Sequence, residues 1–97
     1  MFEWDEVKRQ ATIEKHGLDF CDMIEVLAHP HLVIPAQTQG EERFLAIGGF
    51  DGLTVVVVYT LRGDAIRLIT ARRARQNEKN HYQAFLARRG AETAGEH

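Results

Sequence analysis

The fold is decided by one stretch of the chain, Leu53-Thr54-Val55-Val56-Val57-Val58-Tyr59-Thr60-Leu61-Arg62-Gly63-Asp64-Ala65-Ile66-Arg67-Leu68-Ile69-Thr70-Ala71. The run Val55–Val58 is apolar on both faces of an extended chain, which indicates a central strand. Gly63-Asp64 suits a two-residue turn, after which the chain returns antiparallel. The stretch therefore predicts a β-hairpin in the middle of a sheet.

The predicted register of this hairpin gives its two faces different characters. Counting from the turn, Arg62 pairs with Ala65, Thr60 with Arg67, Val58 with Ile69 and Val55 with Arg72. One face is then almost wholly apolar, whereas Arg62 and Arg67 are diagonal neighbours on the other. Two long cations on a central hairpin are not expected beneath a helix, so we predict that this second face is open.

The remaining helices and strands are predicted from helix-capping residues, from proline and glycine, and from the spacing of apolar residues. Helices are expected over residues 5–17, with Asp5 and Gly17 as caps, over 19–28, and over 75–89 with Gly90 as the cap. Further strands are expected over 32–34, ended by Pro35, and over 41–50. The order ααββββα predicts an α+β fold: a four-stranded antiparallel sheet with two N-terminal helices and a C-terminal helix, packed on one face.

Composition limits the class of protein. The 97 residues, 44% of them hydrophobic, predict a single domain over residues 1–90, followed by a disordered tail over 91–97. With an acidic amino terminus, no 18-residue apolar run and a lone Cys21, we expect a cytoplasmic protein without a membrane span or a disulfide. The histidines lack the spacing of a zinc site, so we expect no metal and no cofactor.

The net charge of −2 hides a strong asymmetry. Residues 1–61 hold four Lys/Arg against ten Asp/Glu, a balance of −6, and residues 62–89 hold eight against two, a balance of +6. Such asymmetry suggests an anionic ligand for the C-terminal part.

Several segments, in order and naturally spaced over roughly residues 2–85, resemble the BrnT family of type II toxins. They are Phe2-Glu3-Trp4-Asp5, Lys8, Lys15-His16-Gly17, Phe20, Glu25-Val26, Gly40-Glu41-Glu42-Arg43-Phe44, Ile47-Gly48, Val58-Tyr59-Thr60-x-Arg62-Gly63-Asp64, Ile66-Arg67-x-Ile69-Thr70-Ala71-Arg72-Arg73-Ala74 and Glu78…Tyr82. The resemblance implies a RelE-like fold and a ribonuclease that arrests translation. It also implies a BrnA-type antitoxin with a ribbon-helix-helix DNA-binding part, a 2:2 complex and binding of operator DNA only through the antitoxin.

One departure from the family pattern is visible. Where family members usually carry Ser or Thr, this chain has Arg75, three residues before Glu78. The side-chain half of a capping box is thereby lost, at a cost of about 1 kcal/mol, although Glu78 can still reach back to an amide.

Cleavage of RNA without a metal needs a base for the 2′-hydroxyl proton, cations for the charge on the phosphorane, and an acid for the leaving 5′ oxygen. The candidate catalytic residues are Lys15, His16, Arg62, Arg67, Arg72 and Arg73. The arginines suit the charge-holding role, whereas His16 is the candidate proton carrier and Lys15 a phosphate clamp.

Each assignment has a plainer interpretation. The arginines could form a solvated surface, with Arg67 paired to Asp64 or Glu42. Lys15 and His16 could serve only to stabilise the carboxyl end of their helix, where the helix dipole favours cations. His81 and Tyr82 are second candidates for proton transfer, and Glu41 or Glu42 for a base.

Two functional hypotheses follow. The first is a metal-independent endoribonuclease toxin, for which Arg62→Ala or Arg72→Ala abolishes growth arrest. The second is a non-catalytic module that binds nucleic acid or an antitoxin with the same basic face, such as an inactivated toxin that acts as a co-repressor.

Overall fold

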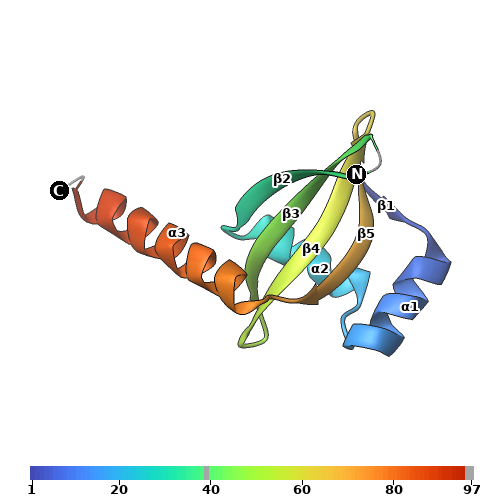
Figure 1. Ribbon diagram of the computed structural model, residues 1–97, viewed down its shortest axis with the longest axis horizontal. Helices are drawn as coiled ribbons and strands as arrows, with labels where there is room; N and C mark the ends of the chain where they lie inside the picture. Colours follow the sequence, from blue (N-terminus) through green and yellow to red (C-terminus); the bar gives the residue numbers. More distant parts are fainter. Residues whose placement is uncertain (39, 96–97) are drawn as a thin grey trace.

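The computed structural model describes residues 1–38 and 40–95, and it consists of three helices and one five-stranded sheet (Figure 1). In chain order the elements are β1 (Phe2–Trp4), α1 (Glu6–His16), α2 (Phe20–Ala28), β2 (Leu32–Thr38), β3 (Glu41–Phe50), β4 (Leu53–Arg62), β5 (Ala65–Arg73) and α3 (Gln76–Gly95). The order of strands across the sheet is β1-β5-β4-β3-β2. Among the described residues, no helix is both long and apolar enough to cross a membrane.

The predicted α+β class is confirmed, but the four-stranded antiparallel sheet is wrong. β1 lies parallel to β5, with Phe2 opposite Ile66 and Trp4 opposite Leu68, so the sheet has five strands of mixed direction. A three-residue strand is too short for the alternation of side chains to reveal it. β2 also differs, because it continues through Pro35 to Thr38. Proline is tolerated there because β2 is an edge strand, whose proline can lack an N–H without breaking a ladder bond.

The central hairpin forms as predicted near its turn and departs from the prediction farther away. Arg62 pairs with Ala65 and Thr60 with Arg67, as expected. A β-bulge between Val58 and Tyr59 then shifts the register, so that Val58 pairs with Thr70 and Val55 with Arg73. The predicted pairs of Val58 with Ile69 and Val55 with Arg72 are therefore wrong, because one strand carries an extra residue.

The bulge decides the direction of two arginines. Arg72 pairs with Val56 and Arg73 with Val55, so the two side chains leave the sheet on opposite faces. Alternation along β4, together with the extra residue that the bulge adds to β5 between Arg67 and Arg72, puts Arg62, Arg67 and Arg72 on the same face, which we call the arginine face. The opposite face, against which α2 packs, is the helix-side face.

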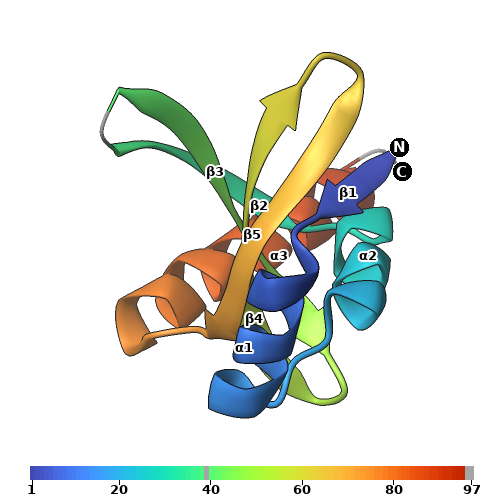
Figure 2. The ribbon, with the colours of Figure 1, turned by 90° about the vertical axis from the view of Figure 1, so that its right-hand side faces the viewer.

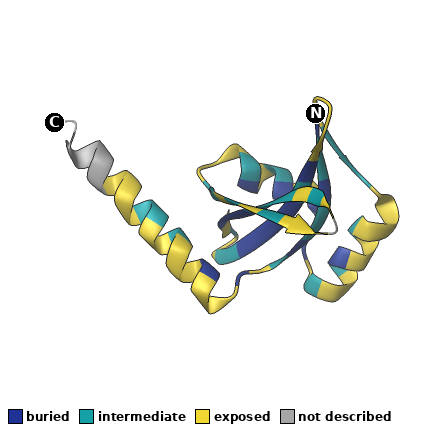
Figure 3. Cartoon of the chain, turned by 45° about the horizontal axis from the view of Figure 1, so that its top comes forward, coloured by how far each residue is buried: buried dark blue, intermediate teal, exposed yellow. Residues whose placement is uncertain are grey.

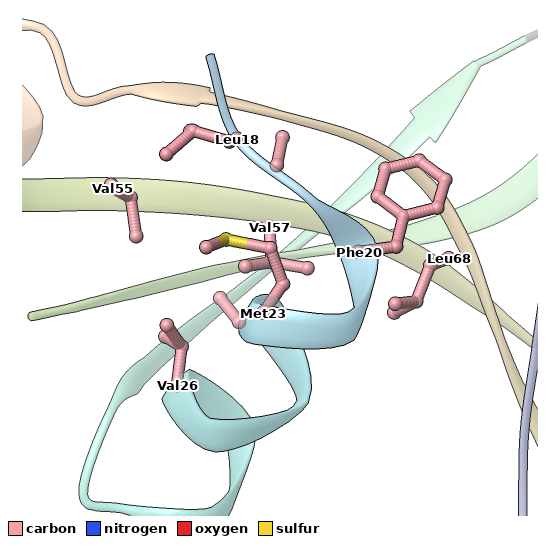
Figure 4. Packing of buried hydrophobic residues seen from close by; sticks show 9 residues of the cluster. Leu18, Phe20, Met23, Val26, Val55, Val57 and Leu68 are labelled. Carbon is pink, nitrogen blue, oxygen red and sulfur yellow. The ribbon is translucent and has the colours of Figure 1, made fainter. Parts of the chain in front are cut away.

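Both faces bury apolar side chains, as the valine run predicts. On the helix-side face, Phe20, Met23 and Val26 of α2 pack against Val55, Val57, Leu68 and Ala71 (Figure 4). On the arginine face, Ile47, Val56, Val58 and Ala74 form a second cluster, against which Tyr82 of α3 packs. The expectation that all helices lie on one face is thus wrong for α3, because Tyr82 packs the first turns of α3 against the arginine face.

The first two helices end where the sequence predicts. The Asp5 carboxylate accepts a hydrogen bond from the Val7 amide at 2.8 Å, and Gly17 closes α1 with a left-handed φ of 69°. Asp19 caps α2 through the Cys21 amide at 3.0 Å and also accepts two bonds from Arg9, at 2.8 and 2.9 Å. Arg9 therefore ties α1 to the start of α2.

The third helix is longer than predicted and projects from the sheet (Figures 1 and 3). We expected it to end at Arg89 with Gly90 as its cap, but α3 continues to Gly95. Gly90 is not among the glycines with positive φ, so it does not adopt the left-handed conformation that would stop the helix. Of the disordered tail predicted for residues 91–97, residues 96 and 97 lie outside the described residues, and the helix takes up the rest.

Candidate functional site

A cationic pocket lies where α1 ends and where β5 leads into α3. Its volume is about 390 Å³, within the range of small-ligand sites. Its lining consists of Lys15, His16, Arg72, Arg73 and Arg75. Four of the six predicted site residues therefore meet in one place, although they come from segments more than fifty residues apart in the sequence.

These residues come together because the end of α1 and the end of β5 lie side by side. Lys15 and His16 form the last turn of α1, which packs beside β5. Gly17 stops the helix at this point, so that both side chains sit at its carboxyl end. The partial negative charge of that end favours cations there, by about 0.3–1 kcal/mol each. Arg72 and Arg73 are the last residues of β5, and Arg75 precedes the first turn of α3.

Arg72 is fixed by an ion pair with Glu78 on α3. The guanidinium donates two parallel hydrogen bonds, from Nη1 to Oε1 and from Nη2 to Oε2, both at 2.8 Å. Glu78 is only 8% exposed and accepts a third bond, from the Arg75 amide at 2.7 Å. The hydrogen bonds from Arg72 outweigh the effect of burial and lower the pKa of Glu78 to about 2. Glu78 is therefore ionised at neutral pH.

The capping box at the start of α3 is half complete. Glu78 reaches back to the Arg75 amide, as the sequence predicts, whereas Arg75 offers no side-chain oxygen in return. The Arg75 side chain instead adds a fifth basic group to the lining of the pocket.

The charges of Lys15 and Arg73 are available to bind an anionic ligand. Both are exposed, and within the described residues neither is ion-paired to a carboxylate. The carboxylate of Glu78, at the first turn of α3, is already engaged by Arg72. The pocket is therefore strongly positive, and guanidinium groups of this kind suit the bidentate binding of phosphate.

The other two predicted arginines, Arg62 and Arg67, lie toward the turn of the hairpin and do not line this pocket. Arg67 is five residues before Arg72 on β5, a separation of about 16 Å along a strand. It donates to Glu3 at 2.6 Å, not to Asp64 or Glu42, because β1 brings Glu3 directly opposite Arg67. Arg62 is exposed beside the turn. The arginines thus do not form one array.

The secondary candidates lie elsewhere. His81 lines a smaller pocket of about 210 Å³ with Leu32 and Phe85, between β2 and α3. Tyr82 packs in the core of the arginine face. Glu41 is paired to Arg43 at 3.1 Å, and Glu42 is exposed on the same strand. None of these residues lines the cationic pocket.

Two contributors to the site were not predicted from the sequence: Arg75 as a lining residue and Glu78 as the partner of Arg72. The spacing of Arg75 and Glu78 carried the signal, since a capping-box glutamate must lie at the first turn of α3. What it could not show was that β5 ends beside that turn.

The substitution Arg75→Ser tests whether the arginine at this position costs the helix α3 its N-terminal side-chain cap. Serine at this position is expected to complete the capping box and raise the free energy of unfolding by about 1 kcal/mol. Urea denaturation followed by circular dichroism measures the change. Arg88→Ser, an exposed site within α3, is the control and is expected to change stability by less than about 0.5 kcal/mol. Equal stability of Arg75→Ser and the parent would contradict the half-box interpretation.

Comparisons with known proteins agree on one family. The family model described as the ribonuclease toxin BrnT of type II toxin–antitoxin systems matches residues 4–78. A solved structure, the 1.1 Å crystal structure of the Brucella abortus ribonuclease toxin BrnT, is 39% identical, with a TM-score of 0.66. The match covers 78% of this chain and 99% of that one. A search of curated proteins found no match.

Proposed function

The chain belongs to the BrnT family of ribonuclease toxins of type II toxin–antitoxin systems, and from this premise we propose that it cleaves RNA at the cationic pocket, without a metal, and thereby arrests translation. The observation that carries the proposal is the convergence of Lys15 and His16 from α1 with Arg72, Arg73 and Arg75 from the β5–α3 junction. The volume and charge of this pocket suit one phosphodiester group and its neighbouring sugar.

The roles of the residues follow from their chemistry. His16 is the pocket residue with an imidazole, which can both accept and donate a proton, so it takes the proton of the attacking 2′-hydroxyl. The 2′ oxygen then bonds to phosphorus, the bond from phosphorus to the 5′ oxygen breaks, and the leaving oxygen takes a proton from the imidazolium or from water. The products are a 2′,3′-cyclic phosphate and a 5′-hydroxyl end.

The cations stabilise the charge that builds during this step. Arg73 and Lys15 bind the non-bridging oxygens, since their charges are not neutralised within the described residues. Arg72 contributes a guanidinium whose direction Glu78 fixes. Arg62 and Arg67 lie too far away for the same phosphate, so we assign them to flanking parts of the RNA backbone along the arginine face.

The cellular setting is part of the same proposal. We expect a cytoplasmic toxin of RelE-like ancestry, neutralised by a BrnA-type antitoxin whose ribbon-helix-helix part binds operator DNA. A complex of two toxins and two antitoxins is the expected assembly.

Growth after induced expression tests the proposal, with His16→Gln as the diagnostic variant. Loss of the proton carrier is expected to slow RNA cleavage about 100-fold and to relieve growth arrest. His29→Gln, an exposed histidine after α2, is the matched control and should arrest growth as the parent does. Full arrest by soluble His16→Gln would remove His16 from the mechanism, and absence of arrest by the soluble parent would overturn the proposed function.

A further inference from the structure

Apolar side chains are exposed on the helix-side face near the turn of the central hairpin. Leu61 is 57% exposed, and it pairs with the half-buried Ile66. Beside them, the rings of Phe44 and Tyr59 stack at 5.3 Å with an angle of 22° between their planes, and both rings are half-buried. We call Phe44, Tyr59, Leu61 and Ile66 the outer apolar patch. Figure 2 shows the two hairpin tips extending beyond α1 and α2, so the helices leave this part of the sheet uncovered.

The patch is distinct from the cationic pocket. The pocket lies at the end of β5 that leads into α3, whereas Leu61 and Ile66 lie at the opposite end of the same hairpin. Contiguous exposed apolar surface that includes aromatic rings commonly marks a protein–protein interface.

Charge distinguishes the kinds of partner. Alternation of side chains turns Arg43, Arg62 and Arg67 away from the patch, to the arginine face. Glu42, two residues before Phe44 on β3, shares the helix-side face and is exposed. Asp22 and Glu25, on the helix that covers the rest of this face, are exposed as well. The acidic side chain that borders the patch on this face is therefore Glu42, and α2 adds Asp22 and Glu25 farther along the same face, in line with the balance of −6 over residues 1–61.

We propose that the outer apolar patch is the docking site of an antitoxin segment whose apolar side chains are flanked by lysine or arginine. The inference rests on the proposed function, because a type II toxin has an antitoxin partner. RNA is disfavoured as the occupant, since acidic side chains repel its phosphates. A second copy of this chain is disfavoured as well, because a two-fold contact would bring two acidic surfaces together.

Binding of a purified BrnA-type antitoxin, the partner proposed above, tests the inference, with isothermal titration calorimetry as the readout. Leu61→Asp places a charge in the patch and is expected to weaken binding at least tenfold. Val7→Asp is the matched control, because Val7 is 76% exposed on α1 and outside the patch; it should bind as the parent does. Glu42→Lys, also exposed, removes charge complementarity without altering apolar surface and should weaken binding severalfold.

The outcomes separate this inference from the proposed function. Parent-like affinity of folded Leu61→Asp and Glu42→Lys would overturn the docking site, whatever their toxicity. Growth arrest by Leu61→Asp that co-expressed antitoxin no longer relieves is the expected result in cells. If the parent does not arrest growth, the proposed function fails while the calorimetry still decides the docking site. If Leu61→Asp loses affinity for an RNA oligonucleotide and not for the antitoxin, the patch is an RNA site and the inference is wrong.

Discussion

Glu78→Ala is expected to lower the free energy of unfolding by about 3 kcal/mol. The substitution leaves the guanidinium of Arg72 without its partner in a site where that side chain is only 22% exposed. It also removes the acceptor of the Arg75 amide at the start of α3. Urea denaturation measures the loss. Glu25→Ala, an exposed glutamate on α2, is the control and should change stability by less than about 0.5 kcal/mol.

Glu78→Gln separates the ion pair from the cap. Oε1 of Glu78 accepts from both Arg72 Nη1 and the Arg75 amide, and a glutamine oxygen in the same place keeps both bonds. The glutamine NH₂ group would then face Arg72 Nη2, where two donors meet. We expect Gln to be less destabilising than Ala but to loosen Arg72, so that RNA cleavage slows at unchanged helix content. Equal stability of Ala, Gln and parent would contradict the structural role of the pair.

The ion pair of Arg72 with Glu78 also makes the stability of the folded state depend on pH in the acidic range. Because the pKa of Glu78 is lowered to about 2, from an ordinary 4.5, its ionised form stabilises the folded state. This contribution is complete above about pH 4.5 and is lost as the pH falls toward 2. The parent should therefore lose more stability than Glu78→Gln over this range.

Arg73→Ala is expected to reduce RNA cleavage by about 10²–10³-fold, which is the effect of removing one preorganised donor to a developing oxyanion. It is the cleaner test of the pocket than Arg72→Ala, since Arg73 is exposed and its removal leaves no buried carboxylate unpaired. Stability should stay within about 0.5 kcal/mol of the parent. Single-turnover cleavage of an RNA oligonucleotide measures the rate.

The matched control for Arg73→Ala is Arg62→Ala. From the sequence alone, Arg62 was expected to be as essential as Arg72, but it lies beside the hairpin turn, away from the pocket. We now expect Arg62→Ala to slow cleavage less than tenfold, through weaker binding of flanking RNA. An essential Arg62 combined with a dispensable Arg73 would move the active site to the hairpin end of the sheet.

What the sequence could predict depended on local signals. The valine run and the Gly63-Asp64 turn define the central hairpin, and Asp5 and Gly17 define the limits of α1. These signals also sufficed to place Lys15 and His16 at a helix end. Arg72 and Arg73 were predicted together with Arg62 and Arg67, and of these four the fold brings Arg72 and Arg73 into the pocket.

What the sequence could not predict depended on contacts between distant segments. The bulge opposite Val58 has no local signature, yet it decides which face each arginine takes: Arg72 lies on the arginine face and Arg73 on the helix-side face, the reverse of the predicted register. β1 is visible only through its pairing with β5, and that pairing is why Arg67 binds Glu3. The ion pair of Arg72 with Glu78 likewise depends on where β5 ends relative to α3.

The most direct test of RNA cleavage at the cationic pocket is the chemistry of the cleaved ends. The purified chain, freed of its antitoxin, is incubated in EDTA with an RNA oligonucleotide, and the products are analysed by mass spectrometry. A second substrate carries 2′-deoxy sugars, and Arg73→Ala is assayed in parallel. We expect 2′,3′-cyclic phosphate and 5′-hydroxyl ends from RNA, no cleavage of the deoxy substrate, and a loss of about 10²–10³-fold in the rate of Arg73→Ala. Cleavage that requires a divalent metal, ends with a 5′-phosphate, or a folded parent that binds RNA without cleaving it would contradict the account.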